Sequence, residues 1–134
     1  MESKYNSLHI TAFVNNFIVK TKRERFIYLW LNNNRHDKAI DVLNHFALEN
    51  FINAVTINDF NSDSDAKTNA NKVCYLISPN KLIDNSYLNL SEAITAIEQQ
   101  YCGSIISVVP GQLAYYRCEI TLRNTFRLKF QIMA

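Results

Sequence analysis

Residues 103–119 read GSIISVVPGQLAYYRCE. Two runs rich in β-branched and aromatic residues, 104–109 and 112–118, flank the pair Pro110-Gly111. Proline fixes φ and glycine accepts a positive φ, so this pair fits the middle of a type II turn. A two-residue type II connection would splay twisted strands, and we therefore expect a slightly longer or bulged hairpin at this point.

The two adjacent tyrosines of this stretch, Tyr115 and Tyr116, point to opposite faces of a sheet because strand side chains alternate. Tyr115 shares its face with Leu113 and Arg117. One hypothesis is that Tyr115 and Arg117 line a ligand groove beside the helices. The alternative, which the sequence favours, is the centre of a sheet in which the tyrosine hydroxyl finds a partner at the rim.

Two more strands are predicted outside this hairpin. The run VCYLIS, residues 73–78, is short, apolar and rich in strand formers. The run FRLKFQI, residues 126–132, alternates apolar and polar side chains, which is typical of a strand with one buried and one wet face. We expect residues 73–78 and 104–109 to be central in the sheet and residues 126–132 to lie at or near an edge.

The first half of the chain is predicted to be helical. Apolar residues recur at three- and four-residue steps over residues 7–19, which indicates an amphipathic helix. Thr21 and Glu24 fit a capping box that would start a second helix. Asn34 is expected to cap a third, which would continue through the segment NRHDKAIDVLNHFALE.

A later helix is predicted over residues 89–101, where Asn89 and Glu92 again fit a capping signal. Gly103 follows where a left-handed residue often ends a helix. Residues 58–72, NDFNSDSDAKTNANK, are polar and without periodicity, so we expect a mobile loop there.

Helices before residue 60 and strands after residue 100 predict an α+β fold. In this fold the N-terminal helices pack on a mostly antiparallel sheet of about four strands formed by the C-terminal half. At 134 residues the chain is expected to be a single domain, 1–134. Its helical part would cover about 7–50, its mobile loop about 58–72 and its sheet part about 73–134.

A five-residue pattern that occurs twice in the chain suggests an anion site. Thr21-Lys22-Arg23-Glu24-Arg25 and Asn34-Arg35-His36-Asp37-Lys38 share the order cap, basic, basic, acid, basic. Cations in a first helical turn oppose the helix dipole unless an anion binds the free amide groups. The anion-binding candidates are therefore Lys22, Arg23, Arg35 and His36. The alternative is that these residues form a basic face exposed to solvent and bind no anion. Glu24 and Asp37 would then supply the negative charges that favour the starts of the two helices.

Several classes of function lack their usual signs. No nucleophile-elbow, zinc-helix, dinucleotide or P-loop motif is present, and His36 and His45 are nine residues apart rather than four. A calcium loop at 59–70 fails at its glycine and glutamate positions, and three widely spaced cysteines suit neither a disulfide framework nor a zinc site. The net charge of +2 gives little support to nucleic-acid binding, and no apolar run is long enough for a membrane span.

Two segments, KTKRERFIYLWLNNNRHDKAIDVLNHF and GSIISVVPGQLAYYRCE, resemble a family of small uncharacterised bacterial proteins. That family has a basic helix pair ending in His-Phe and a later Pro-Gly turn followed by Ala-Tyr-Tyr and an acidic residue. The matching residues here are His45-Phe46, Pro110-Gly111, Ala114-Tyr115-Tyr116 and Glu119. The resemblance implies a bacterial, cytoplasmic, single-domain protein and brings no catalytic residue with it.

These observations favour a small cytoplasmic module without catalysis of its own. It would act through self-association, as a homodimer, or through a protein partner, because apolar strands incompletely covered by short helices leave a surface to bury. The second reading is an anion-binding protein, for nucleotides, phosphorylated ligands or nucleic acid. The third is an enzyme in which His36 or His45 meets Tyr, Glu or Cys of the sheet in one cleft. We expect no catalytic residue, no metal, no cofactor and no membrane contact.

Overall fold

A computed structural model of the chain describes residues 2–44, 48–119 and 125–132. They form an α+β fold around one six-stranded sheet in which every neighbouring pair is antiparallel. The strands follow the order β1-β6-β5-β4-β2-β3, which places β5 and β4 in the middle. Their bounds are β1 (Ala54–Ile57), β2 (Val73–Ile77), β3 (Ser86–Asn89), β4 (Ser104–Val109), β5 (Leu113–Arg117) and β6 (Arg127–Gln131).

Four of these strands, β2, β4, β5 and β6, correspond to the four that the sequence predicts, and two more flank them. The added strands β1 and β3 are the two edges, and β1 belongs to the N-terminal half of the chain. Each has four residues and no fully buried one, so neither shows the long alternation or apolar run that marks a strand. Edge strands of this kind form because a neighbouring strand offers its hydrogen bonds.

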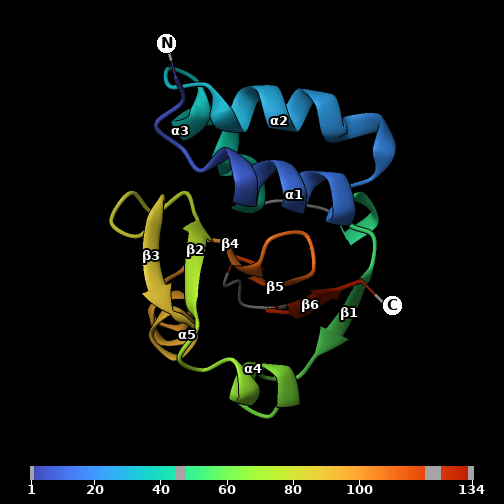
Figure 1. Cartoon of the computed structure of the whole chain (residues 1–134), viewed down its shortest axis with the longest axis vertical. Coiled ribbons are helices and arrows are strands. Elements are labelled where there is room, and N and C mark those ends of the chain that lie inside the picture. The colour runs from blue at the N-terminus through green and yellow to red at the C-terminus, as the bar shows by residue number, and fades with distance from the viewer. Residues whose placement is uncertain (1, 45–47, 120–124, 133–134) are drawn as a thin grey trace.

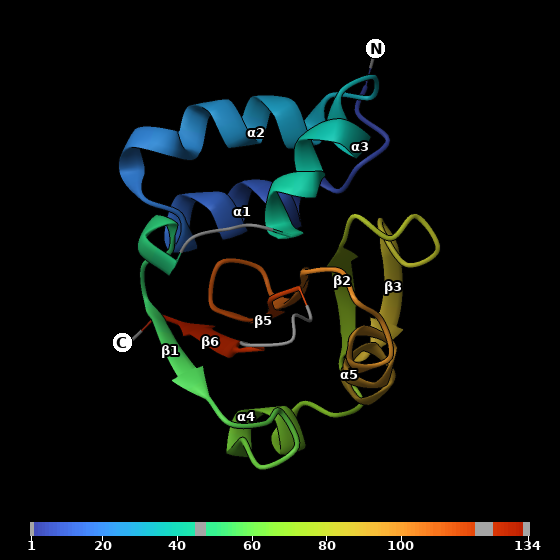
Figure 2. The same cartoon turned by 180° about the vertical axis from the view of Figure 1, so that it is seen from behind.

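Helices cover both faces of the sheet. In both views of the molecule, α1 and α2 lie together at one end and α4 at the other, with the sheet between (Figure 1, Figure 2). Figure 2 shows α5 in front of β2 and β3. The helices are α1 (Ser7–Phe17), α2 (Arg23–Leu31), α3 (His36–Ala39), α4 (Ser64–Thr68) and α5 (Leu90–Glu98), with short 3-10 turns η1 (Lys20–Lys22), η2 (Ile40–Asn44) and η3 (Leu48–Asn50). None of the helices traced in the described ranges has the length and apolarity that crossing a bilayer requires.

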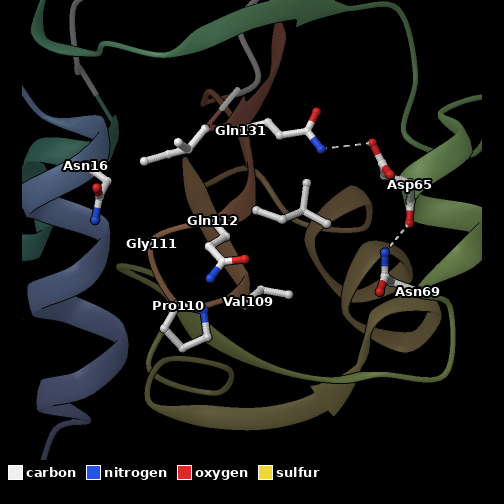
Figure 3. Close-up of a pocket in the computed structure, with 10 residues that line it drawn as sticks. Asn16, Asp65, Asn69, Val109, Pro110, Gly111, Gln112 and Gln131 are labelled. Carbon is white, nitrogen blue, oxygen red and sulfur yellow. Dashed lines mark hydrogen bonds between the residues drawn. The ribbon is translucent and has the colours of Figure 1, made fainter. Parts of the chain in front are cut away.

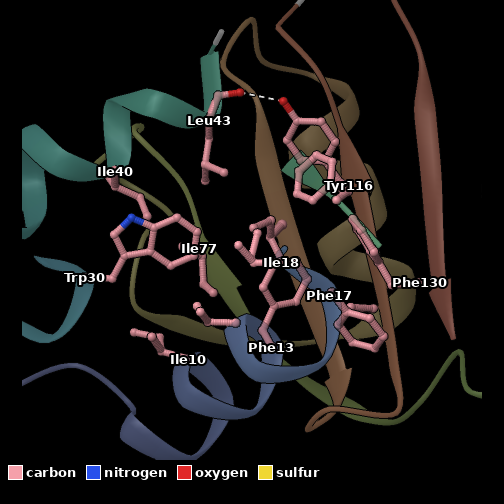
Figure 4. Packing of buried hydrophobic residues seen from close by; sticks show 14 of the residues in the cluster. Ile10, Phe13, Phe17, Ile18, Trp30, Ile40, Leu43, Ile77, Tyr116 and Phe130 are labelled. Atoms are coloured by element: carbon pink, nitrogen blue, oxygen red, sulfur yellow. Dashed lines mark hydrogen bonds between the residues drawn. The ribbon is translucent and has the colours of Figure 1, made fainter. Parts of the chain in front are cut away.

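The larger core lies between the sheet and α1. The predicted apolar stripe of α1 is confirmed, since Ile10, Phe13, Val14 and Phe17 are completely buried. Figure 4 shows Phe13 and Phe17 beside Phe130 of β6, and the Phe13 and Phe130 rings meet edge to face with centroids 5.1 Å apart. Burying side chains of this size contributes about 1.5–3 kcal/mol each, so α1 is the main cover of this face.

A second core lies on the opposite face, beneath α4 and α5. Ile94 and Ile97 of α5 pack there with Ile106 of β4 and Tyr115 of β5. Tyr116 faces the α1 core instead, so the predicted division of the tyrosine pair between two faces is confirmed. Both faces of the central strands are therefore buried.

The starts of α2 and α3 differ from the sequence expectation. Thr21 lies inside the 3-10 turn η1, and α2 begins two residues later without a side-chain cap, so Thr21 and Glu24 form no capping box. Asn34 does not cap α3 either. The side-chain oxygen of Asn32 accepts hydrogen bonds from the amides of Asn34 (2.9 Å) and Arg35 (3.0 Å), which turns the chain before α3 begins. The expected long third helix is four residues of α3 followed by η2.

The stretch expected as a mobile loop, 58–72, contains helix α4. Asp63 caps it by accepting a hydrogen bond from the amide of Ala66 at 3.2 Å. Phe60 and Ala66 are buried in the second core and fix this stretch to the sheet. Two buried apolar residues in a stretch of fifteen are too few for a periodic signal, so the sequence does not indicate this helix.

The Pro110-Gly111 turn has the predicted form. The amide of Gln112 donates to the carbonyl of Val109 at 2.9 Å, Gly111 has φ +71°, and the β4–β5 register shifts beside the turn as expected for a bulged hairpin. Gly103 has a different role from the expected helix stop, because α5 ends at Glu98 and Gly103 has no positive φ. A Cβ atom at Gly103 would overlap the carbonyl oxygen of Leu43, so glycine is needed for close packing.

Candidate functional site

Tyr115 and Arg117, the predicted ligand-groove residues, are both buried beneath the helices. The Tyr115 hydroxyl donates to Asp63 Oδ2 at 2.7 Å, which ties β5 to the cap of α4. Arg117 donates from Nη2 to the carbonyl of Gln100, and its Nη1 lies 3.7 Å from Glu98 Oε2. The two side chains share a face as predicted, and they join the sheet to α4 and α5.

The protonation of these groups reflects their burial. Desolvation, followed by the hydrogen bond to Asp63, raises the pKa of Tyr115, so the phenol keeps its proton. Desolvation also lowers the pKa of Arg117, and the charge of Glu98 offsets part of that effect. For Asp63, burial acts to raise the pKa of the carboxyl, but the hydrogen bonds from Tyr115 and Lys129 outweigh it and the pKa falls. A neutral phenol and an ionised carboxylate form a structural pair that joins β5 to the start of α4.

The four predicted anion-binding residues are not brought together. Lys22 and Arg23 lie at the start of α2, whereas Arg35 and His36 follow its end, and nine helical residues span about 13 Å. Arg23 donates from Nε to the carbonyl of Ile18 at 2.8 Å, and Lys22 donates to the side chain of Asn50. A single anion site built on both helix starts is therefore absent from the described structure.

His36 is completely buried, so it lies outside any basic surface. Its Nδ1 is 2.5 Å from the carbonyl oxygen of Trp30, its Nε2 is 2.6 Å from Asp84 Oδ2, and the Tyr5 ring stacks on it with centroids 3.6 Å apart. His36, Asp37 and Asp84 bring three potential metal-ligand atoms within 4.8 Å of one another. The other histidine considered from the sequence, His45, falls outside the described residues.

A different basic surface forms between α2 and α3. Arg25, Arg35 and Lys38 line a hollow of about 400 Å³ whose apolar wall includes Leu29 and Ala39. None of the three cationic side chains has a hydrogen-bond or ion-pair partner among the described residues. Arg35 is one of the four predicted anion-binding residues, and Arg25 and Lys38 occupy the last position of the two similar segments from which that prediction was made.

β1 is one of the two edge strands of the sheet, so one of its sides has no partner strand among the described residues. Paired residues of an antiparallel ladder alternate in the direction of their amide groups. The amide of Gln131 donates to the carbonyl of Asn53 at 3.1 Å, so Asn53 faces β6 and the next residue, Ala54, faces away, as does Thr56. Val55 between them is 59% exposed.

Two hollows border this strand. One, of about 280 Å³, is lined by Asn53 and Val55 together with Lys129 of β6. The other, of about 290 Å³, is lined by Ile57 at the end of β1 together with Asp63, the cap of α4. An exposed strand edge with a depression at each end is suited to binding an additional β-strand.

A third hollow, of about 620 Å³, lies beside the Pro110-Gly111 turn. Asn16 of α1 lies on one side, and Asp65 of α4 and Asn69, which follows α4, lie on the other, with the turn between them (Figure 3). Its polar walls are internally bonded: Asn69 donates to the carbonyl of Asp65 at 2.8 Å and Gln131 to its carboxylate at 3.3 Å. The Pro110-Gly111 turn thus borders an open depression lined by side-chain amides, which also reaches the end of β6 at Gln131.

Comparison with known proteins adds no function to this geometry. No protein-family model matches the chain, and neither a curated protein nor a solved structure matches it. The functional argument therefore rests on the contacts described above.

Proposed function

We propose that this chain is a non-enzymatic, cytoplasmic binding module that acts through the free edge of β1. The edge takes an extended strand, from a second copy or from a protein partner. The observation that carries the proposal is the outward direction of the Ala54 and Thr56 amide and carbonyl groups beside an exposed Val55. Backbone groups at a sheet edge supply affinity, and depressions beside it select alternate side chains of the added strand.

The ligand-groove candidates Tyr115 and Arg117 support a binding role through the edge rather than a catalytic one. The Tyr115 hydroxyl donates to Asp63, and Arg117 Nη2 donates to the carbonyl of Gln100. Both side chains are buried, whereas a catalytic group must lie within reach of a substrate. They are better suited to holding α4 and α5 on the sheet.

A second copy fits the β1 edge in one register particularly well. If two β1 strands pair antiparallel with Val55 opposite its own copy, Ala54 of each chain lies opposite Thr56 of the other. These pairs then exchange all four outward hydrogen bonds, and the two Val55 side chains meet at the closer, non-hydrogen-bonded position. Such an isologous contact closes as a dimer and extends the sheet across both chains.

The substitution Thr56→Pro tests this edge. It removes an amide hydrogen that no described contact uses, so the fold should remain while strand addition is blocked. Thr56→Val, which keeps the amide, is the matched control. Light scattering should show a dimer at high concentration for the wild type and Thr56→Val, and a monomer for Thr56→Pro.

A strictly monomeric wild type would overturn self-association and leave a protein partner as the occupant of the edge. Displayed libraries of extended peptides then test that partner, with Thr56→Pro as the negative control. Failure of every peptide together with a monomeric wild type would overturn the proposed function.

A second candidate function rests on the hollow between α2 and α3. Three unpaired cations around an apolar floor attract an anion such as a phosphorylated metabolite, a nucleotide or a short oligonucleotide. A panel of these ligands should raise the melting temperature of the wild type and of Lys20→Ala, an exposed basic control outside the hollow. The double variant Arg25→Ala/Arg35→Ala should show no rise. A rise that survives in the double variant would remove this candidate.

A further inference from the structure

The imidazole of His36 lies between two oxygen atoms. Its Nδ1 is 2.5 Å from the carbonyl oxygen of Trp30, which can only accept a hydrogen bond. Its Nε2 lies 2.6 Å from the Asp84 carboxylate. The ring is therefore oriented by Trp30 with Nε2 directed at a carboxylate.

The surroundings of this contact have the form of a metal site. A metal-binding histidine usually donates its other ring nitrogen to a carbonyl, and a metal-binding carboxylate is itself hydrogen-bonded. Here Trp30 accepts from His36, and Asp84 Oδ1 accepts from the amide of Ser78 at 2.9 Å. The Tyr5 ring, stacked 3.6 Å from the imidazole between centroids, fixes its plane.

Asp37 adds a second carboxylate from the exposed side of the cluster. Its oxygen, His36 Nε2 and the Asp84 oxygen all lie within 4.8 Å of one another. Lys81 Nζ is 3.5 Å from Asp37 Oδ2 and is itself largely exposed. A cation that enters from solvent thus meets one imidazole and two carboxylates, with a flexible lysine as its competitor.

We propose that His36, Asp37 and Asp84 bind a divalent transition-metal ion of the zinc class. One nitrogen and two oxygen ligands suit such an ion, with the fourth position open to water on the Asp37 side. Ligand atoms on a tetrahedral zinc ion are roughly 3.3 Å apart. The Asp84 carboxylate must therefore move back from its 2.6 Å contact with His36, and the exposed Asp37 side chain, within 4.8 Å of the other ligand atoms, must adjust to the ion. The site is independent of the β1 edge and of the basic hollow.

The test uses the full chain, stripped of metal with a chelator and then titrated with zinc chloride. Calorimetry should show one ion per chain, and the melting temperature should rise by about 5–10 °C once zinc exceeds its dissociation constant about a hundredfold. Asp37→Asn removes an exposed ligand, so the variant should fold and lose most of this rise. Asp41→Asn, an exposed aspartate of η2, is the matched control and should keep it.

Two further measurements sharpen the outcome. Lys81→Met removes the competing cation and should tighten zinc binding several-fold. Magnesium and calcium, which prefer all-oxygen ligands, should produce little shift. A wild type that does not respond to zinc would overturn the proposal. An equal response from Asp37→Asn would place the bound zinc elsewhere and also overturn it.

Discussion

The two glycines are required for different reasons. Gly111 holds φ +71° in the turn between β4 and β5, and a Cβ atom there would lie 2.6 Å from Asn16 Nδ2 of α1. Gly103 has an ordinary φ but lies against the backbone of Leu43. The turn could be predicted because proline and glycine are neighbours in the sequence. The close approach to Leu43 could not, because its partner is about 60 residues away.

Alanine at the two glycines should therefore have unequal effects. Gly111→Ala should lower the free energy of unfolding by about 1–2 kcal/mol through its positive φ. Gly103→Ala should cost at least about 3 kcal/mol, because a backbone carbonyl must move to admit the methyl group. Urea unfolding of both variants measures this difference.

Removing the contact with α1 separates the two effects at Gly111. In an Asn16→Ala background, Gly111→Ala keeps the backbone strain and loses the side-chain clash, so part of its cost should disappear. Equal costs for the two single glycine variants would contradict the close packing of Gly103.

At the scale of single elements, the sequence predicts two caps of the same kind, and only one of them forms in the structure. Asn89 accepts a hydrogen bond from the amide of Glu92 at 3.0 Å and donates to its carboxylate at 2.6 Å, which confirms the predicted start of α5. Thr21 has an equally good local pattern, but the chain enters α2 through a 3-10 turn that carries Thr21 past the cap position. The path of the chain before α2 is set by the β-bridge between Ile18 and Phe51. Because Phe51 is distant in the sequence, the residues around Thr21 do not predict this path.

The two caps give a paired prediction. Asn89→Ala should lower the free energy of unfolding by about 1 kcal/mol, because an amide of the first turn of α5 loses its partner. Thr21→Ala, at the unformed cap, should change it by less than about 0.5 kcal/mol. Thermal or urea unfolding measures both, and a cost at Thr21 equal to that at Asn89 would contradict the observed start of α2.

The contact between α5 and β6 predicts a pH effect. Arg127 donates to both carboxylate oxygens of Glu98 at 2.7 and 2.8 Å. This hydrogen bond lowers the pKa of Glu98 below its ordinary 4.5, against the opposing effect of burial. A lowered pKa gives stability that is present above the ordinary value and lost as the pH falls through the folded value.

Unfolding followed from about pH 6 to about pH 3 checks this contact. The free energy of unfolding of the wild type should fall on acidification. Glu98→Gln, which keeps the shape without the charge, should show a smaller fall. The prediction fails if the two pH profiles have the same slope.

For the whole molecule, the position of each strand in the sheet explains which strands could be predicted from the sequence and which could not. The segregation of helices and strands and the split of Tyr115 from Tyr116 follow from local periodicity. The edges β1 and β3 are stabilised by pairing with distant strands, so four-residue segments such as Ala54–Ile57 carried no signal of their own. The candidate site was missed for the same reason, because an edge is defined by its neighbours.

The position of strands in the sheet also predicts hydrogen exchange. Amides of β4 and β5, which are central and covered on both faces, should exchange slowest. The outward amides of Ala54 and Thr56 should exchange much faster than those of β4 and β5, unless a bound strand protects them. Exchange measured by nuclear magnetic resonance at low and high protein concentration checks both statements. Slow exchange confined to α1 and α2 would contradict the central place of β4 and β5.

The pairing of β1 with β6 has a consequence for synthesis on the ribosome. Ile57 pairs with Arg127, about 70 residues later in the chain. At about 5–20 residues per second, translation leaves β1 without its partner for several seconds after it is made. The nascent chain therefore presents β1 without its partner until β6 has been made, and this side of the sheet closes only then. Chaperone access and proteolysis of the growing chain should be greatest at β1 during that interval.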